Sequence, residues 1–185
     1  MKRSLISAVA VLVSAAFLLS SAAVGQQGLP PGSLVIRVLV EKKVLQLPDG
    51  QLYWRIENYP TLAQAQAVAG LWGLAAEFEG KVWLFRLGPA SGSSADGSKI
   101  AEVGPLPPVV APEYLLRINT PSGPLGSTTI VHTHPGSEGF YVLKGEVCVR
   151  TPQGVIRIPA GRTEAGPPAG TPTQVSRCGS TDLRA

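Results

Sequence analysis

The chain has 185 residues and a mass of 19.3 kDa, enough for one domain with a hydrophobic core of its own. Lys and Arg number 16 against 12 Asp and Glu, with no run of basic residues, which argues against a surface that follows nucleic-acid phosphates. Glycine (21) and proline (17) are spread along the chain without a period, and this favours many short strands joined by turns over a few long helices.

Residues 1–25 are typical of a secretory signal peptide. Lys2 and Arg3 precede an apolar run over 5–19, and small residues follow over 20–25. Basic, apolar and small-residue zones in this order predict cleavage, and hence a secreted or periplasmic protein with no stable membrane span after cleavage. The alternative is an uncleaved membrane anchor, for which the apolar run is short.

Residues 26–112 are interpreted as an N-terminal extension with strands and one helix that packs on the remaining domain. Thr61 and Gln64 form a capping-box pattern, which predicts a short helix ending near Gly70. The segment 89–98 is rich in Gly and Ser and is expected to be a surface loop. Apolar, β-branched or aromatic runs predict strands at 34–40, 52–56 and 81–87.

From residue 113 onward the pattern is entirely β, with Pro, Gly and Asn between nearly all of the short apolar runs. Several short strands at close spacing predict a sandwich or barrel. The fold class expected for the whole chain is therefore all-β with one short helix. The expected strands are 114–118, 128–133, 140–143, 146–151, 155–158 and 173–177.

The two histidines of the chain, His132 and His134, fall on one predicted strand. Residues two apart on a strand share a face, so both imidazoles are expected to leave the sheet together. A Pro-Gly turn follows, after which Glu138 can return a carboxylate beside them. Two imidazoles and one carboxylate suit a divalent metal ion such as Fe, Mn, Zn or Ni. The alternative is a pair of solvent-exposed strand histidines without a ligand.

The wider spacing resembles the first motif of the cupin superfamily. Gly126, His132, His134, Glu138 and Gly145 are separated by five, one, three and six residues, which matches that motif at every position. The resemblance implies a small conserved-barrel (type-2) cupin domain over residues 113–185, folded as a double-stranded β-helix, also called a jelly-roll barrel. It also implies that the two histidines and the glutamate hold the metal.

The second cupin motif fits this sequence in two frames. A frame that starts at Gly154 puts Glu164 where the family has its fourth ligand, a histidine. A frame that starts at Gly161 puts Thr173 there and Arg177 where the family has an asparagine. The second frame is preferred because it leaves room for two strands and a turn after the first motif. In both frames the fourth histidine is absent, so the resemblance implies a site with three protein ligands and a weak fourth position at Thr173.

Strand parity extends this site to a pocket lining. Phe140 and Val142 share the parity of Glu138, and Arg177 shares that of Thr173, so all three are expected to line the pocket. For Arg177, a salt bridge at the rim of the pocket is the alternative to contact with an anionic ligand.

The resemblance also bears on the two cysteines. In the cupin jelly roll the strands that carry Cys148 and Cys178 are neighbours, and parity turns both side chains outward. Export would preserve a disulfide between them. Two separate thiols are the alternative.

The expected function is that of an exported cupin-domain protein that binds a divalent metal and a small organic ligand in its barrel. A metal-dependent oxygenase or isomerase acting on a small molecule is one alternative, and a metal-free ligand-binding barrel is another, because fold does not fix function. Few residues follow Arg177, whereas cupin barrels continue with a further strand. The N-terminal half, a partner subunit in a homodimer, or residues lost by truncation are the three possible sources of that strand.

Overall fold

The computed structural model describes residues 32–92, 94 and 96–179, so the predicted signal peptide lies outside the described residues. No helix in this part of the chain is long and apolar enough to cross a membrane. The described elements are, in chain order, β1 (Val35–Val44), β2 (Tyr53–Tyr59), α1 (Leu62–Ala69), β3 (Gly73–Phe78), β4 (Lys81–Gly88), β5 (Ser98–Val103), β6 (Tyr114–Ser122), β7 (Gly139–Tyr141), β8 (Glu146–Thr151), β9 (Gly154–Pro159), β10 (Thr163–Ala165) and β11 (Gln174–Arg177).

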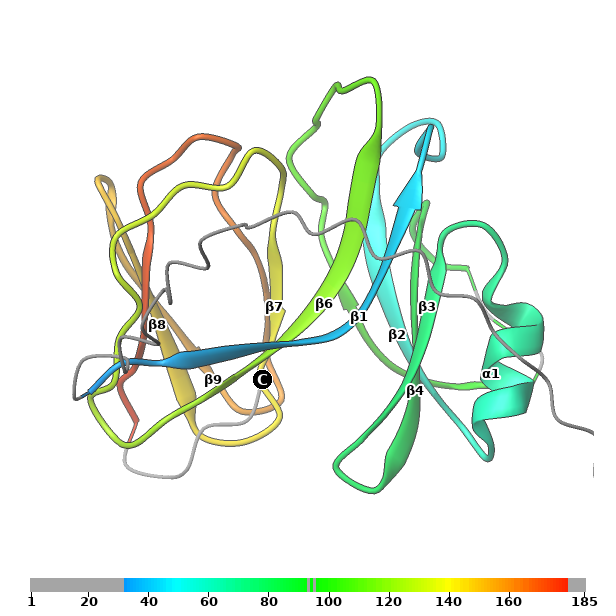
Figure 1. The fold of residues 1–185 in the computed structure, drawn as a ribbon, viewed down its shortest axis with the longest axis horizontal. Helices are drawn as coiled ribbons and strands as arrows, with labels where there is room; N and C mark the ends of the chain where they lie inside the picture. The colour runs from blue at the N-terminus through cyan, green and yellow to red at the C-terminus, as the bar shows by residue number, and fades with distance from the viewer. Residues whose placement is uncertain (1–31, 93, 95, 180–185) are drawn as a thin grey trace, which may run out of the picture.

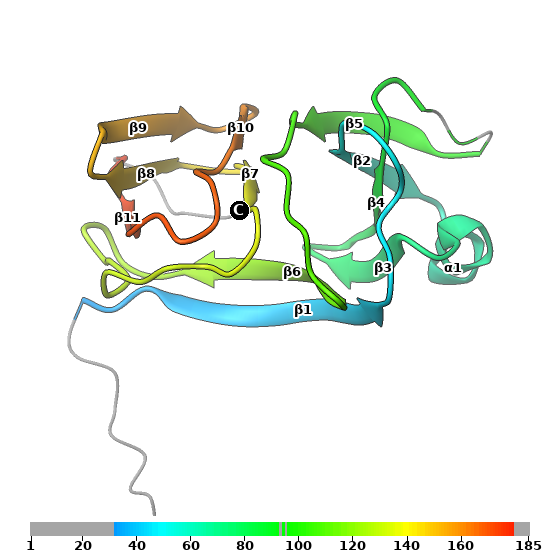
Figure 2. The same ribbon diagram turned by 90° about the horizontal axis from the view of Figure 1, so that it is seen from above.

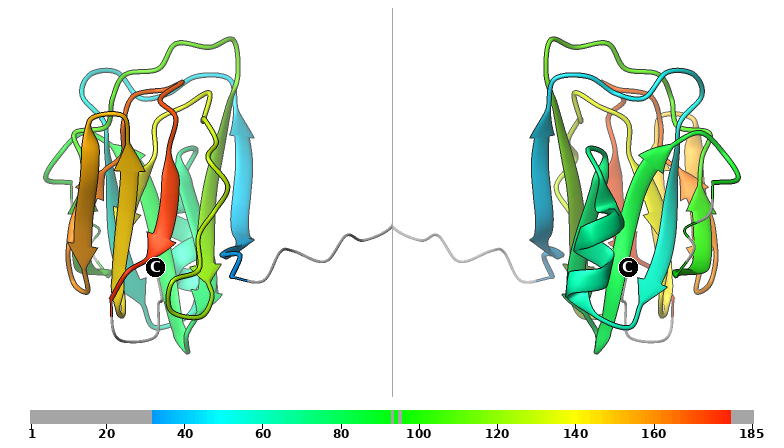
Figure 3. Two further views of the ribbon diagram at one scale, coloured as in Figure 1. Left: turned by 90° about the vertical axis from the view of Figure 1, so that its left-hand side faces the viewer. Right: turned by 90° about the vertical axis from the view of Figure 1, so that its right-hand side faces the viewer.

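The first half of the chain forms an antiparallel sheet in the order β3-β4-β2-β5, with α1 against one face (Figures 1 and 3). The helix begins after Thr61, whose side-chain oxygen accepts a hydrogen bond from the backbone N–H of Gln64, and its C-cap is Gly70. The helix therefore begins at the Thr61 cap and ends at Gly70, as predicted. Ala65 of the helix is fully buried against Tyr59 and Leu84 of the sheet.

The longest strand, β1, pairs antiparallel with β6, so that Val35 lies opposite Ser122 and Val44 opposite Tyr114. These two strands run along one side of the molecule, beneath both the four-stranded sheet and the strands of the second half (Figure 2). The N-terminal part of the chain thus supplies the strand that pairs with β6.

The second half forms two smaller antiparallel sheets, with strand orders β11-β8-β9 and β10-β7. Two isolated bridges, Thr128 to Ser176 and His132 to Thr173, place the segment 128–132 along the free edge of β11. The predicted strand over this segment is therefore reduced to bridges, and no closed barrel is identified among the described residues. The expected β-rich fold with antiparallel sheets and one short helix is confirmed.

Two hydrophobic cores stand on opposite sides of β7. On the side of the second half, Val142, Val147, Val149, Ile158 and Val175 pack together with Leu34. On the side of the four-stranded sheet, Tyr141 and Leu143 pack against a core of Ile56, Trp83 and Val103. The short continuous apolar run over 140–143 is explained by this burial on both faces.

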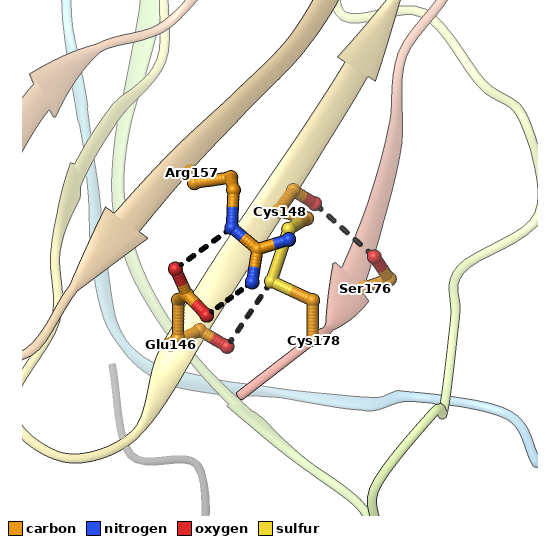
Figure 4. The surroundings of a disulfide bond; sticks show 5 residues. All are labelled: Glu146, Cys148, Arg157, Ser176 and Cys178. Atoms are coloured by element: carbon orange, nitrogen blue, oxygen red, sulfur yellow. Dashed lines mark hydrogen bonds and ion pairs between the residues drawn. A yellow bond between two sulfur atoms is a disulfide. The ribbon is translucent and has the colours of Figure 1, made fainter. Parts of the chain in front are cut away.

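Cys148 on β8 and Cys178, just after β11, form a disulfide with a Cα–Cα distance of 5.8 Å (Figure 4). Ser176 lies opposite Cys148 in the register of the two strands, so the bond joins diagonal neighbours on one face of the sheet. The guanidinium of Arg157 lies beside it and forms two hydrogen bonds with the Glu146 carboxylate. The cysteine pair that the resemblance implied is therefore bonded in the structure.

Candidate metal and ligand site

A cavity of about 240 Å³ lies between the four-stranded sheet and the strands of the second half. Strands β1 and β6 contribute a third side through residues such as Ile36 and Ile118. A wider hollow of about 890 Å³ adjoins it, and Trp54, Arg117 and His134 line both spaces. The two spaces therefore meet near His134, whose side chain is 40% exposed.

His132 is held in one orientation by its neighbours. Its backbone exchanges two hydrogen bonds with Thr173, at 3.0 and 2.8 Å. Its Nδ1 lies 2.8 Å from the carbonyl oxygen of Ile130, and because a carbonyl oxygen only accepts, Nδ1 carries the proton. In the neutral ring the lone pair is then on Nε2. A carbonyl that fixes the tautomer in this way is the usual support of a metal-binding histidine.

The lone-pair nitrogen of His132 points at the second imidazole. Its Nε2 lies 3.1 Å from Nε2 of His134, with the rings at 88° to each other. Burial, followed by the neighbouring His132, lowers the pKa of His134. The two rings therefore offer nitrogen donors at one point on the cavity wall.

Glu138 completes the polar end of the cavity. Its Oε2 lies 3.7 Å from Nε2 of His134 and, within the described residues, has no hydrogen-bond partner although it is buried. Burial raises the pKa of this carboxyl to about 6, against a smaller lowering effect of His132. A buried carboxylate oxygen without a partner is costly, and a cation at this point would satisfy it.

These spacings can be compared with those in a metal centre. Two ligand atoms each about 2.0–2.1 Å from a metal, at angles between octahedral and tetrahedral, lie about 2.9–3.4 Å apart. The 3.1 Å between the two Nε2 atoms falls in this range, and the 3.7 Å to Glu138 lies just outside it. Accordingly, no group of three or more His, Cys, Asp or Glu side chains within the described ranges is already placed to hold a metal ion. The donor set fits a divalent metal if the Glu138 carboxylate moves slightly inward.

Thr173 lies beside the histidines through its bridge to His132, but its side chain is turned to other partners. The residue is 1% exposed, and its Oγ1 donates to the carbonyl of Thr171 at 3.1 Å. Glu164, the ligand of the rejected frame, lies on β10 opposite Phe140. Neither residue is among those that line the cavity.

The three predicted lining residues have different positions. Phe140 lines the cavity. Val142 differs from the prediction: it is fully buried in the core on the second-half side, because its neighbours Tyr141 and Leu143 face the cavity and Val142 points the opposite way. Arg177 also differs. It points inward with Val175, which does line the cavity, but lies beyond its end, where Nη1 donates to the carbonyl of Gly123.

The opposite wall of the cavity was not predicted from the sequence. Trp54 and Ile56 on β2, Trp83 and Phe85 on β4 and Val103 on β5 alternate toward it. Ile56 lies opposite Phe85 in the register, and the rings of Trp83 and Phe85 stack with centroids 6.3 Å apart. The alternation of apolar residues along 52–56 and 81–87 signalled a buried face. The partner of that face could not be known without the long-range arrangement.

Comparison of this chain with protein-family models, with curated proteins and with solved structures finds no match in any of the three.

Proposed function

We propose that this chain is an exported cupin-like protein that binds a divalent metal ion on His132, His134 and Glu138 and a small organic molecule in the adjoining cavity. The observation that carries the proposal is the convergence of the two Nε2 atoms, 3.1 Å apart, on a cavity wall where the buried Glu138 oxygen lacks a partner. Nitrogen and carboxylate donors of this kind suit Fe, Mn, Zn or Ni.

The backbone at the motif glycines supports the cupin reading. Gly126 and Gly145, which bound the first motif, have φ angles of 79° and 83°. Gly161 and Gly170 of the preferred second frame both have φ of 79°. Side chains other than glycine rarely adopt such φ values, so the resemblance rests on positions where the local structure requires glycine. Gly170 also donates its N–H to the carbonyl of His134, which ties the second motif to the first.

Strand pairing supports the same reading. In a jelly roll, strands from the two ends of the domain lie side by side in two facing sheets. Here the segment 128–132, β11, β8 and β9 form one such row, and β10 pairs with β7. The strand expected after Arg177 has its counterpart in β1, which pairs with β6. A double-stranded β-helix completed by an N-terminal strand is therefore the architecture that we propose.

A metal with three protein ligands keeps positions open for water or a substrate. When bound, it would polarise an oxygen atom of the organic molecule or activate dioxygen. The residues of the chain would position that molecule: the cavity walls exclude water from its apolar part, and the Ile130 carbonyl keeps the lone pair of His132 directed at the metal. A metal-dependent oxygenase or isomerase is the enzymatic form of this proposal.

The largely apolar cavity favours a second candidate, a carrier or scavenger of small molecules that works without metal. Trp54, Phe85 and Phe140 line it, and apolar walls of this kind bind ligands through burial alone.

The two candidates separate in a titration of chelator-treated protein with Zn²⁺, Mn²⁺ and Fe²⁺, followed by an oxygen-uptake screen of the metal forms. Glu138→Gln should weaken metal binding by tenfold or more, as expected for loss of a ligand. Glu164→Gln is the matched control, because it removes an acidic side chain outside the cavity. Equal affinities for the wild type and Glu138→Gln would remove Glu138 from the ligand set, and no binding of any of these metals would favour the metal-free carrier.

A further inference from the structure

We infer that the cavity binds a single aromatic ring that carries one oxygen-bearing group, with the ring against the wall formed by β2 and β4 and the oxygen directed to His132, His134 and Glu138. The polar end of this inference rests on the proposed function. The ring-binding wall comes from the four-stranded sheet and is independent of the proposed metal site.

The size of the cavity supports a ring of this kind. An apolar protein cavity of about 150 Å³ is large enough for benzene. The 240 Å³ found here therefore admits one ring and a few further atoms, and a larger ring system would have to extend into the adjoining hollow. At one end the cavity is closed where β7 approaches β5: a Cβ added to Gly139 would lie 2.8 Å from Cγ1 of Val103.

The walls have the chemistry that a ring requires. Trp54 and Phe85 stand on the sheet side, and Phe140 and Tyr141 stand on the β7 side. Aromatic pairs contribute about 0.5–1.5 kcal/mol beyond the area that they bury, so aromatic walls distinguish a flat ring from a saturated ring of similar size.

The distribution of charge places the oxygen of the ligand. Only Arg117 and Glu138 carry a formal charge among the described lining residues. The Nε of Arg117 is 2.7 Å from the carboxylate of Glu41, so its charge is already compensated. Without a metal the cavity has no spare cation for an anionic ligand, and Glu138 repels one. A divalent metal bound to the histidines would attract an anionic group to the end of the cavity next to Glu138, and to that end alone.

The test is ligand-observed NMR at pH 7.5 with three probes: benzyl alcohol, its saturated counterpart cyclohexylmethanol, and benzoate. In metal-free protein we expect benzyl alcohol to bind about fivefold more tightly than cyclohexylmethanol, and benzoate to bind most weakly. Loading with Zn²⁺ should then strengthen the binding of benzoate about tenfold or more and change the binding of cyclohexylmethanol little. Equal binding of the two alcohols, or no binding of benzyl alcohol at millimolar concentration, would overturn the inference.

Variants locate the ring. Trp54→Leu should weaken the binding of benzyl alcohol about fivefold, whereas Trp54→Phe, which keeps an aromatic ring, should retain most of the affinity. Trp72→Leu is the matched control, since Trp72 donates to the carbonyl of Gln46 and does not line the cavity. Thermal unfolding reports whether each variant is folded. The comparison of the three probes on the wild type tests the inference even if a variant does not fold. If no metal binds but metal-free protein prefers the aromatic probe, the metal proposal fails and the assignment of the ring to the wall formed by β2 and β4 holds. If metal binds but the two alcohols bind equally, only the assignment of the ring fails.

Discussion

Thr173 and His132 lie directly opposite each other and exchange both of their backbone hydrogen bonds, at 3.0 and 2.8 Å. In an antiparallel pair such residues project their side chains to the same face. The position at which the proposed cupin-like reading expects a histidine is therefore beside the first imidazole. Under that proposal, this favours the frame that starts at Gly161 over the frame that uses Glu164.

This relationship predicts the effect of Thr173→His. A third imidazole beside His132 completes a four-ligand set, so metal affinity should rise by tenfold or more, measured by competition with a chromophoric chelator. The control is Gln174→His, because the next residue on β11 faces the other side of the sheet. A folded Thr173→His variant with lower metal affinity would show that this side chain does not reach the metal.

The disulfide closes a loop with a sequence separation of 30 residues. For a loop of this length the entropic model gives about 3–4 kcal/mol of stabilisation. The double variant Cys148→Ser/Cys178→Ser should lose roughly this amount in urea unfolding, and dithiothreitol should destabilise the wild type but not the variant. Thiol titration of denatured, unreduced protein should find no free thiol; two per chain would contradict the bond.

The four-stranded sheet buries an ion pair on the face opposite the cavity. Glu57 is fully buried, lies 3.1 Å from Nε of Arg55 and accepts two hydrogen bonds from Ser94. Removing one partner of a buried pair costs about 3–5 kcal/mol, so Glu57→Gln should be strongly destabilising in urea unfolding. Glu41→Gln, which breaks a half-exposed pair with Arg117, should cost less than about 1 kcal/mol. Similar losses in the two variants would contradict the assignment.

The pKa of Glu138 makes the metal-free protein sensitive to pH. Burial raises this pKa from its ordinary value of 4.5 to about 6, so the folded state favours the protonated carboxyl. The resulting stability is fully present below pH 4.5 and is lost as the pH rises through about 6. Relative to Glu138→Gln, the wild type in EDTA should therefore lose about 2 kcal/mol of unfolding free energy between pH 4 and pH 7. A difference that stays flat or rises over this interval would contradict the burial of Glu138.

Features coded by neighbouring residues could be predicted from the sequence. Thr61 and Gly70 set the ends of the helix, and β8 occupies 146–151 as predicted, between Gly145 and a turn. The approach of His132, His134 and Glu138 was predicted from strand period and a Pro-Gly turn, and it is found although the predicted strand is reduced there to the bridge between His132 and Thr173. These inferences succeed because each depends on contacts only a few residues apart.

Long-range features could not be predicted in the same way. The pairing of β1 with β6 joins Val35 to Ser122, and no local signal fixes such a register. The position of Val142 outside the cavity depends on which face of the segment 140–143 packs toward the four-stranded sheet. The short strands β3, β5 and β10 were missed because they take their stability from neighbouring strands and carry weak apolar patterns of their own.

The most direct test of the central claim is the metal content of wild-type protein and of His132→Ala/His134→Ala, purified without chelators and measured by plasma mass spectrometry. The account predicts a near-stoichiometric divalent metal in the wild type, less than about a tenth of that in the double variant, and an unchanged content in Glu164→Gln. Wild-type metal content in the double histidine variant would contradict it.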